Sequence, residues 1–155
     1  MSDGEAITIL IADDDEEDRL LTQEALAESR LANDLRFVED GEELLDYLYH
    51  RGRFAGEGES PRPGLILLDL NMPRMDGREA LREIKSDPAL RSIPVVVLTT
   101  SKAEEDIYRT YELGANSFIV KPVTFAGLAE VMRDFSRYWF EIVELPVHAR
   151  DTRLR

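Results

Sequence analysis

The sequence contains no cysteine, which excludes disulfide bonds, thiolate metal sites and cysteine nucleophiles together. It also lacks long apolar runs. The longest stretches, such as Ile9–Ala12 and Val95–Leu98, are four residues long, whereas a membrane-spanning helix needs roughly 20. No basic start followed by an apolar stretch marks a secretory signal at the N-terminus. We therefore expect a soluble, cytoplasmic protein that does not interact with membranes.

Basic residues are scarce relative to acidic ones. The chain has 19 lysines and arginines against 32 aspartates and glutamates, a formal net charge of −13. Nonspecific nucleic-acid binding relies on Lys and Arg to neutralise phosphates, so this balance argues against a nucleic-acid partner. A length of 155 residues and a hydrophobic fraction of 43% fit one globular domain. We predict this domain over residues 1–146 and a flexible tail over residues 147–155.

Five short apolar runs alternate with amphipathic stretches along the chain. This alternation predicts an α/β fold with a doubly wound, five-stranded parallel sheet. The first, third and fourth runs have almost no polar interruption, as expected for strands covered on both faces. Arg36 interrupts the second run and indicates a shorter edge strand. The five runs are Ile7–Ala12, Leu35–Val38, Leu65–Leu68, Val95–Leu98 and Phe118–Val120.

Helix signals fill the gaps between these runs. The first predicted helix follows the acidic residues 13–18, and the last runs unbroken from Thr124 towards Glu144. The intervening helix starts are marked by Asp40 with Glu43, Asp76 with Gly77, and Ser101 with Glu104. His50–Gly64 holds four glycines and two prolines, so we interpret it as a long loop of open role, with a plain insertion favoured.

Polar residues follow four of the five predicted strands. Asp13 and Asp14 come after the first strand, Asp69 after the third, Thr99 after the fourth and Lys121 after the fifth. In a doubly wound sheet the carboxyl ends of the strands meet at one edge, where ligand sites form. The sequence therefore predicts a site made of three carboxylates, one hydroxyl and one ammonium.

Clustered carboxylates at this edge need a cation. Two charges ~4 Å apart repel by ~4 kcal/mol at an effective dielectric of ~20, and partly hydrated carboxylates suit Mg²⁺. A carboxylate such as Asp69, beside a divalent cation, can attack phosphorus and form an acyl phosphate. Lys121 can pair with Asp69 for stability alone or with a phosphoryl oxygen. We interpret Glu16, Glu17 and Asp18 as the solvated first turn of a helix, where acids favour the helix dipole.

The motifs at these positions resemble the receiver domains of two-component response regulators. The resemblance covers roughly Ile7–Phe140. It implies a flavodoxin-like fold with strand order 2-1-3-4-5, five helices and an extended C-terminal helix. It also implies a protein that accepts a phosphoryl group from a histidine kinase and catalyses only its own phosphorylation and dephosphorylation. The matching motifs are Asp13-Asp14, Leu68-Asp69 with Met72-Pro73 and Asp76-Gly77, Leu98–Ser101, and Val120–Pro122.

The resemblance assigns a role to each matching residue. Asp69 becomes the phosphoacceptor and a metal ligand. Asp14 would bind Mg²⁺ directly, Asp13 would act through water, and the backbone carbonyl of Asn71 would complete the metal site.

Three further residues complete the phosphoryl site and the expected switch. Lys121 would pair with the phosphoryl group, and Thr99 would move to hydrogen-bond one of its oxygens. Phe118 would occupy the aromatic switch position. Because phenylalanine lacks the hydroxyl of tyrosine, a switch at this position would depend on ring packing alone.

The C-terminal region predicts a protein contact. Aromatic and apolar side chains extend the last helix beyond what a small domain needs, and an exposed apolar face of this kind marks an interaction site. We expect a homodimer through Phe135, Trp139, Phe140 and Val143. The loop before Leu65 and the Trp139–Pro146 segment resemble single-domain regulators that partner phytochrome-type histidine kinases, such as bacteriophytochromes.

Two other functions stay open at this point. The first is a receiver-like interaction module that does not accept phosphate. The second is a phosphohydrolase of the haloacid-dehalogenase class, whose nucleophilic aspartate usually follows the first strand and has an acid two positions on. Here Asp69 follows the third strand and Asn71 takes the second position, which disfavours the phosphohydrolase.

Overall fold

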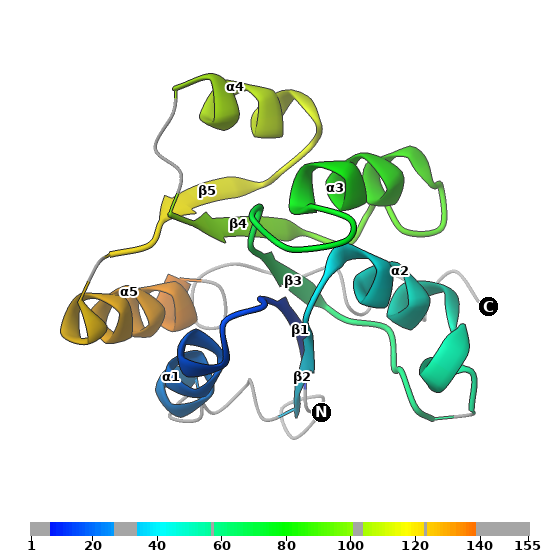
Figure 1. The fold of residues 1–155 in the computed structure, drawn as a ribbon, viewed down its shortest axis with the longest axis horizontal. Helices are drawn as coiled ribbons and strands as arrows, with labels where there is room; N and C mark the ends of the chain where they lie inside the picture. The colour runs from blue at the N-terminus through cyan, green and yellow to red at the C-terminus, as the bar shows by residue number, and fades with distance from the viewer. Residues whose placement is uncertain (1–6, 27–33, 57, 101–103, 123, 139–155) are drawn as a thin grey trace.

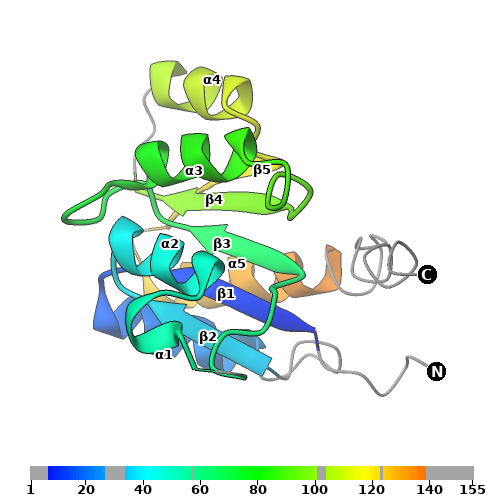
Figure 2. The same ribbon diagram turned by 90° about the vertical axis from the view of Figure 1, so that its right-hand side faces the viewer.

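The chain forms a five-stranded parallel sheet in the order β2-β1-β3-β4-β5. The structure is a computed structural model that describes residues 7–26, 34–56, 58–100, 104–122 and 124–138. Figures 1 and 2 show β2 at one edge of the sheet and β5 at the other. The predicted α/β class and strand order are confirmed. The strands are β1 (Thr8–Ala12), β2 (Asp34–Val38), β3 (Leu65–Leu68), β4 (Val95–Thr99) and β5 (Ser117–Val120).

Helices cover both faces of this sheet. In Figure 1, α1 and α5 lie together on one face, α2 and α3 lie on the other, and α4 lies beyond β5. Two of the predicted helix starts are confirmed by their caps: Asp40 accepts the amide of Glu43, and Asp76 accepts the amides of Arg78 and Glu79. The helices are α1 (Glu16–Leu26), α2 (Gly41–Tyr49), α3 (Gly77–Ser86), α4 (Glu104–Glu112) and α5 (Phe125–Arg137).

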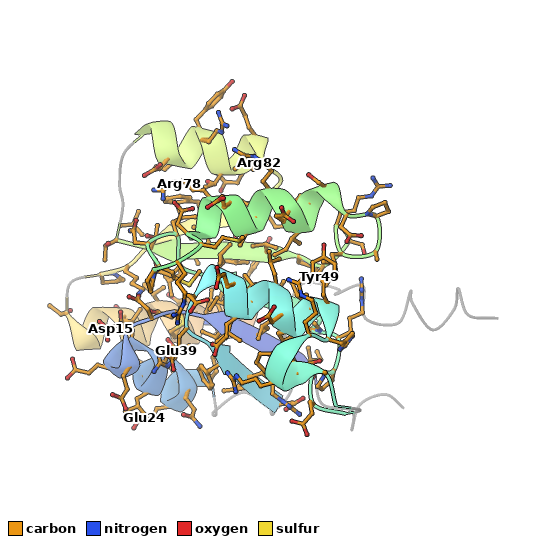
Figure 3. All side chains as sticks on the ribbon, turned by 45° about the vertical axis from the view of Figure 1, so that its right-hand side comes forward. Asp15, Glu24, Glu39, Tyr49, Arg78 and Arg82 are labelled. Atoms are coloured by element: carbon orange, nitrogen blue, oxygen red, sulfur yellow. The ribbon has the colours of Figure 1, made fainter. Side chains whose placement is uncertain are left out.

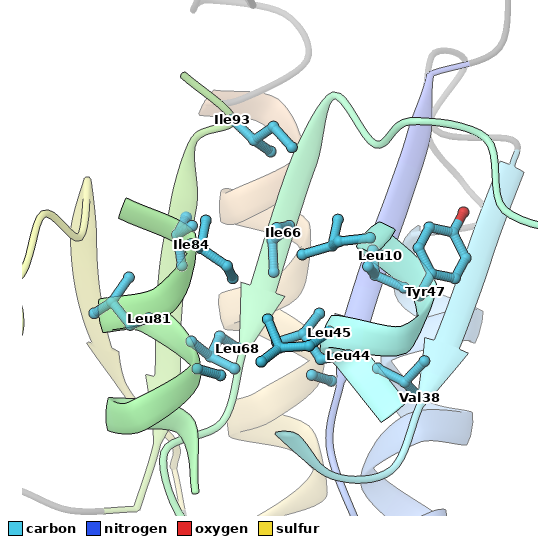
Figure 4. Packing of buried hydrophobic residues seen from close by; sticks show 14 of the residues in the cluster. Leu10, Val38, Leu44, Leu45, Tyr47, Ile66, Leu68, Leu81, Ile84 and Ile93 are labelled. Carbon is cyan, nitrogen blue, oxygen red and sulfur yellow. The ribbon is translucent and has the colours of Figure 1, made fainter. Parts of the chain in front are cut away.

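Alternate residues of each central strand enter two separate cores. Leu10 and Ile66 pack with α2 and α3, as Figure 4 shows. Ile9 and Leu65 point to the opposite face and pack with α1 and α5. Side chains alternate between faces along a strand, so a strand with helices on both sides must be apolar throughout. The uninterrupted apolar runs at β1, β3 and β4 follow from this arrangement.

The second strand is an edge strand, as its interrupted pattern predicts, but the expectation that it is shorter was wrong, because β2 has five residues, as many as β1. β2 pairs only with β1 within the described sheet. Arg36 lies beside Asp34, with its Nε 2.9 Å from Asp34 Oδ1. Thr8 Oγ1 donates to the other oxygen of Asp34 at 2.6 Å. A polar cluster of this kind is tolerated because the edge of the sheet is half-buried rather than covered.

The 50–64 segment packs against α2. It contains a short 3-10 helix, η2 (Gly52–Phe54), and the ring of Phe54 is buried 5.1 Å from that of Tyr47. Tyr47 Oη donates to the carbonyl of Pro61 at 2.8 Å. The sequence pattern indicates a long loop with a plain insertion favoured. These contacts instead pack part of the loop in an ordered conformation against the end of α2.

The C-terminal helix begins as predicted, with Thr124 accepting the amide of Gly127. Phe135 is 3% exposed and belongs to the core that α1 and α5 share with the sheet, so its side chain serves the chain's own packing. The extension towards Glu144, the other predicted interface residues (Trp139, Phe140 and Val143) and the 147–155 tail lie outside the described residues. The homodimer therefore stays a prediction. Within the described part of the chain, no helix is long and apolar enough to cross a membrane.

Candidate functional site

The carboxyl ends of the strands bring the predicted site residues together. Asp13 directly follows β1, Asp69 follows β3, Thr99 ends β4 and Lys121 follows β5. All four side chains are buried. Figure 3 shows the rim of this edge, with Asp15 at the start of α1, Glu39 after β2 and Arg78 at the start of α3.

Lys121 lies at the centre of three carboxylates. Its Nζ is 2.9 Å from Asp13 Oδ2, 2.8 Å from Asp18 Oδ2 and 3.2 Å from Asp69 Oδ2. Burial alone would lower the pKa of Lys121, but the hydrogen bonds to Asp18 and Asp13 and the charges of Asp13 and Asp69 outweigh it and raise that pKa. The ammonium therefore stays charged over the whole physiological range.

Asp13 is a buried carboxyl group whose ionised form is disfavoured in this cluster. Burial raises its pKa to about 6, against the opposing hydrogen bonds from Lys121 and the Asp15 amide, and the charge of Asp69 adds to the increase. One ammonium shared among three carboxylates does not compensate Asp13 fully. A second cation beside the cluster would favour the ionised form of Asp13 and lower its pKa.

The donor set fits a divalent metal ion. Asp13, Asp14 and Asp69 each offer a carboxylate oxygen, and these oxygens all lie within 4.8 Å of one another. Asp14 is exposed, which leaves room for water in the coordination shell. Hard carboxylate oxygens select a hard cation.

The loop after β3 places Asn71 between Asp69 and Thr99. The Asn71 amide donates to Asp69 Oδ1 at 3.0 Å, and its side-chain Nδ2 donates to Thr99 Oγ1 at 3.0 Å. Gly77 allows this loop to turn back, because a Cβ there would lie 2.4 Å from the backbone oxygen of Asp69. Thr99 is therefore held beside Asp69 through the Asn71 side chain.

Phe118 is placed on β5, away from the carboxylate cluster. Its half-buried ring packs against the core on the α2 and α3 face. Its backbone amide donates to the hydroxyl of Tyr111, on α4, at 3.1 Å. The position links β5 to α4, which is where a switch residue has to act. Its predicted role stays a prediction.

The structure corrects the interpretation of Asp18. We assigned this residue with Glu16 and Glu17 to a solvated helix start, but its carboxylate contacts Lys121 in the buried site. Asp15 instead caps α1, since its Oδ1 accepts the amides of Glu17 and Asp18 at 2.9 and 3.1 Å. Sequence reasoning missed Asp18 because its partner lies 103 residues away in the chain.

A doubly wound sheet with an acidic triad, a buried threonine and a lysine at its carboxyl edge defines a receiver of two-component signalling. The family model described as response regulator receiver domain matches residues 9–133. The chain belongs to this family, as the sequence resemblance predicted. This membership favours the receiver interpretation over the phosphohydrolase.

Individual relatives match most of the chain. The response regulator Rcp1 from Synechocystis sp. is 42% identical over 138 residues, covering 89% of this chain and 92% of that protein. The Mn²⁺-bound form of Rcp1 superposes with a TM-score of 0.86 at 41% identity, covering 91% of this chain and 99% of that one. The phosphorylated cyanobacterial phytochrome response regulator RcpA gives a TM-score of 0.85 at 42% identity, with the same coverage.

Proposed function

We propose that this response regulator accepts a phosphoryl group on Asp69 from a histidine kinase and signals through a changed protein contact. The observation that carries this proposal is the arrangement of Asp13, Asp14 and Asp69, whose oxygens lie within 4.8 Å of one another beside the ammonium of Lys121. Phosphorylation of RcpA, a relative with 42% identity, supports the same chemistry here.

In the proposed step, a carboxylate oxygen of Asp69 attacks the phosphorus of a phosphohistidine. The new O–P bond makes an acyl phosphate as the N–P bond of the donor breaks, and the imidazole of the kinase leaves with the electron pair. Asp13, Asp14, Asp69 and the carbonyl of Asn71 would hold Mg²⁺, which neutralises charge on the phosphoryl oxygens when bound. Lys121 supplies the fixed positive charge, and the chain acts only on its own phosphorylation and dephosphorylation.

The hydroxyl of Thr99 provides the proposed link to a conformational change. In the phosphate-free site this hydroxyl accepts a hydrogen bond from Asn71 Nδ2. A phosphoryl group adds −1.5 to −2 charges and three strong acceptor oxygens, so the hydroxyl gains a better acceptor nearby. Reorientation of Thr99 then pulls on the end of β4.

The partner class follows from the relatives. RcpA is a phytochrome response regulator, and Rcp1 is similar over 89% of this chain. We propose a phytochrome-type histidine kinase, such as a bacteriophytochrome, as the phosphoryl donor. We propose that the changed protein contact is a homodimer formed through the residues after Phe135.

Intact mass spectrometry after incubation with acetyl phosphate tests the phosphoacceptor. We expect the native chain to gain one phosphoryl group only with Mg²⁺, and Asp69→Asn to gain none, because the amide is not a nucleophile of comparable strength. Phosphotransfer from a purified bacteriophytochrome kinase repeats the test with the proposed donor. A gain that persists in Asp69→Asn would point to a different acceptor. No gain from either donor would favour the interaction module that works without phosphate.

A further inference from the structure

Asp18 occupies a place in the site that the family motifs do not assign. It lies in the first turn of α1, and its Oδ2 is 2.8 Å from Lys121 Nζ, the shortest of the three contacts to that ammonium. The cap of α1 is made by Asp15, so the Asp18 carboxylate is not needed to start the helix. Its carboxylate instead contacts the lysine.

An ammonium group has three N–H donors and no more. In this site the three donors of Lys121 are matched by Asp13, Asp18 and Asp69. Once Asp69 carries a phosphoryl group, one phosphoryl oxygen can replace its carboxylate at Lys121, and a further phosphoryl oxygen can pair with Lys121 only if Asp13 or Asp18 gives up its hydrogen bond. The geometry therefore sets up a competition for the lysine.

Asp18 is better placed than Asp13 to give way. Asp13 is also held by the backbone amide of Asp15, at 3.0 Å. The side chain of Asp18 is 22% exposed, whereas those of Asp13 and Asp69 are 5% and 9% exposed. Once released, the Asp18 side chain can rotate towards the solvent, where water solvates its charge.

We propose that Asp18 is a positioning residue that holds the Lys121 ammonium in the phosphate-free state and yields that place to a phosphoryl oxygen. This inference rests on the proposed function of Asp69. The charge of Asp18 disfavours the phosphorylated state twice, because its ion pair must break and its carboxylate repels the incoming anion. Asp18 thereby sets the free-energy difference between the phosphate-free and the phosphorylated site.

Beryllofluoride, a tetrahedral mimic of the phosphoryl group, measures this preference at equilibrium in the presence of Mg²⁺. We expect Asp18→Asn to lower the Kd of beryllofluoride about threefold to tenfold. The substitution weakens a partly exposed, charge-assisted hydrogen bond that stabilises only the free state. Glu17→Gln is the matched control, because Glu17 is exposed, lies in the same helical turn and loses the same charge. The control should change the Kd by less than about twofold.

A second measurement needs neither metal nor phosphate mimic. The chain has three lysines, Lys85, Lys102 and Lys121, so the ammonium signals in a ¹H–¹⁵N spectrum can be assigned one by one. Protons of the Lys121 ammonium should exchange slowly with water in the native chain and in Glu17→Gln. They should exchange several-fold faster in Asp18→Asn and in Asp18→Ala, where one of the three partners is weakened or removed.

The outcomes separate this inference from the proposed function. A higher Kd in Asp18→Asn would mean that Asp18 orients Lys121 for the phosphoryl group. A Kd equal to that of Glu17→Gln would mean that Asp18 acts only through its long-range charge. Either result overturns the proposal. Unchanged ammonium exchange overturns it as well. If the native chain failed to bind beryllofluoride, the proposed function would fail, while the exchange measurement would still test the Asp18–Lys121 contact. Asp18→Ala serves both measurements if Asp18→Asn does not fold.

Discussion

Lys121→Met is expected to lower the free energy of unfolding by about 2–4 kcal/mol near neutral pH without divalent metal. Removing one partner of a buried ion pair typically costs 3–5 kcal/mol, because it leaves an uncompensated charge. The lower end of our range allows for the partial exposure of Asp18, which can turn to solvent. The side chains of Asp13 and Asp69 cannot turn to solvent in this way and remain packed together. Urea unfolding followed by circular dichroism measures the change.

Metal and pH should both reduce the effect of this substitution. Mg²⁺ bound by Asp13, Asp14 and Asp69 replaces part of the lost positive charge, so the variant should gain more stability from Mg²⁺ than the native chain does. Burial raises the pKa of Asp13, and protonation of this group removes part of the repulsion, so the deficit should shrink as the pH falls below neutrality.

Arg82→Met is the control for Lys121→Met, because it removes one positive charge from an exposed helix position. It should change the unfolding free energy by less than about 0.5 kcal/mol. A Lys121→Met variant as stable as this control would show that the lysine does not compensate the cluster. A deficit that Mg²⁺ leaves unchanged would show that the three carboxylates do not form the metal site.

Much of the fold could be predicted because it depends on local patterns. A strand covered on both faces must be apolar at successive positions, and residues 65–68 and 95–98 satisfy this without interruption. Capping is also local, so Asp40 and Asp76 marked their helices correctly. The site followed from topology, since parallel strands deliver Asp13, Asp69, Thr99 and Lys121 to one edge whatever the details of packing.

The details that sequence reasoning missed depend on distant partners. A run of six acids from Asp13 to Asp18 has no internal mark that separates a capping residue from a buried ligand. Asp15 and Asp18 take these two roles because of where α1 begins and where Lys121 lies across the sheet. The glycine-rich 50–64 segment indicated only a loop, and its packing through Phe54 depends on the ring of Tyr47 on α2.

The carboxylate cluster should also have a measurable cost to stability, and Asp13→Asn should reveal it. Folding raises the pKa of Asp13 from its ordinary value of 3.8 to about 6. Each pKa unit corresponds to about 1.4 kcal/mol, so the ionised group costs up to about 3 kcal/mol above pH 6. An asparagine keeps a neutral acceptor for Lys121, and we expect it to raise the unfolding free energy by about 2 kcal/mol without metal.

The pH dependence of this gain has a definite sign. Because folding raises the pKa, the folded protein binds a proton at Asp13 more tightly than the unfolded chain does. The native chain should therefore recover stability as the pH falls from about 6 towards about 4, and its difference from Asp13→Asn should close over that range. Urea unfolding of both proteins with a metal chelator present measures this difference and cancels the contributions of all other groups.

Mg²⁺ should reduce the stability advantage of Asp13→Asn over the native chain. The native site gains stability by RT ln(1 + [Mg²⁺]/Kd), whereas Asp13→Asn has lost one of the three clustered carboxylates and should bind the ion more weakly. At saturating Mg²⁺ the advantage of the variant should therefore shrink or vanish. A variant less stable than the native chain without metal would show that Lys121 compensates Asp13 fully. The cluster would then be an ordinary structural ion pair rather than a site whose strain a cation relieves.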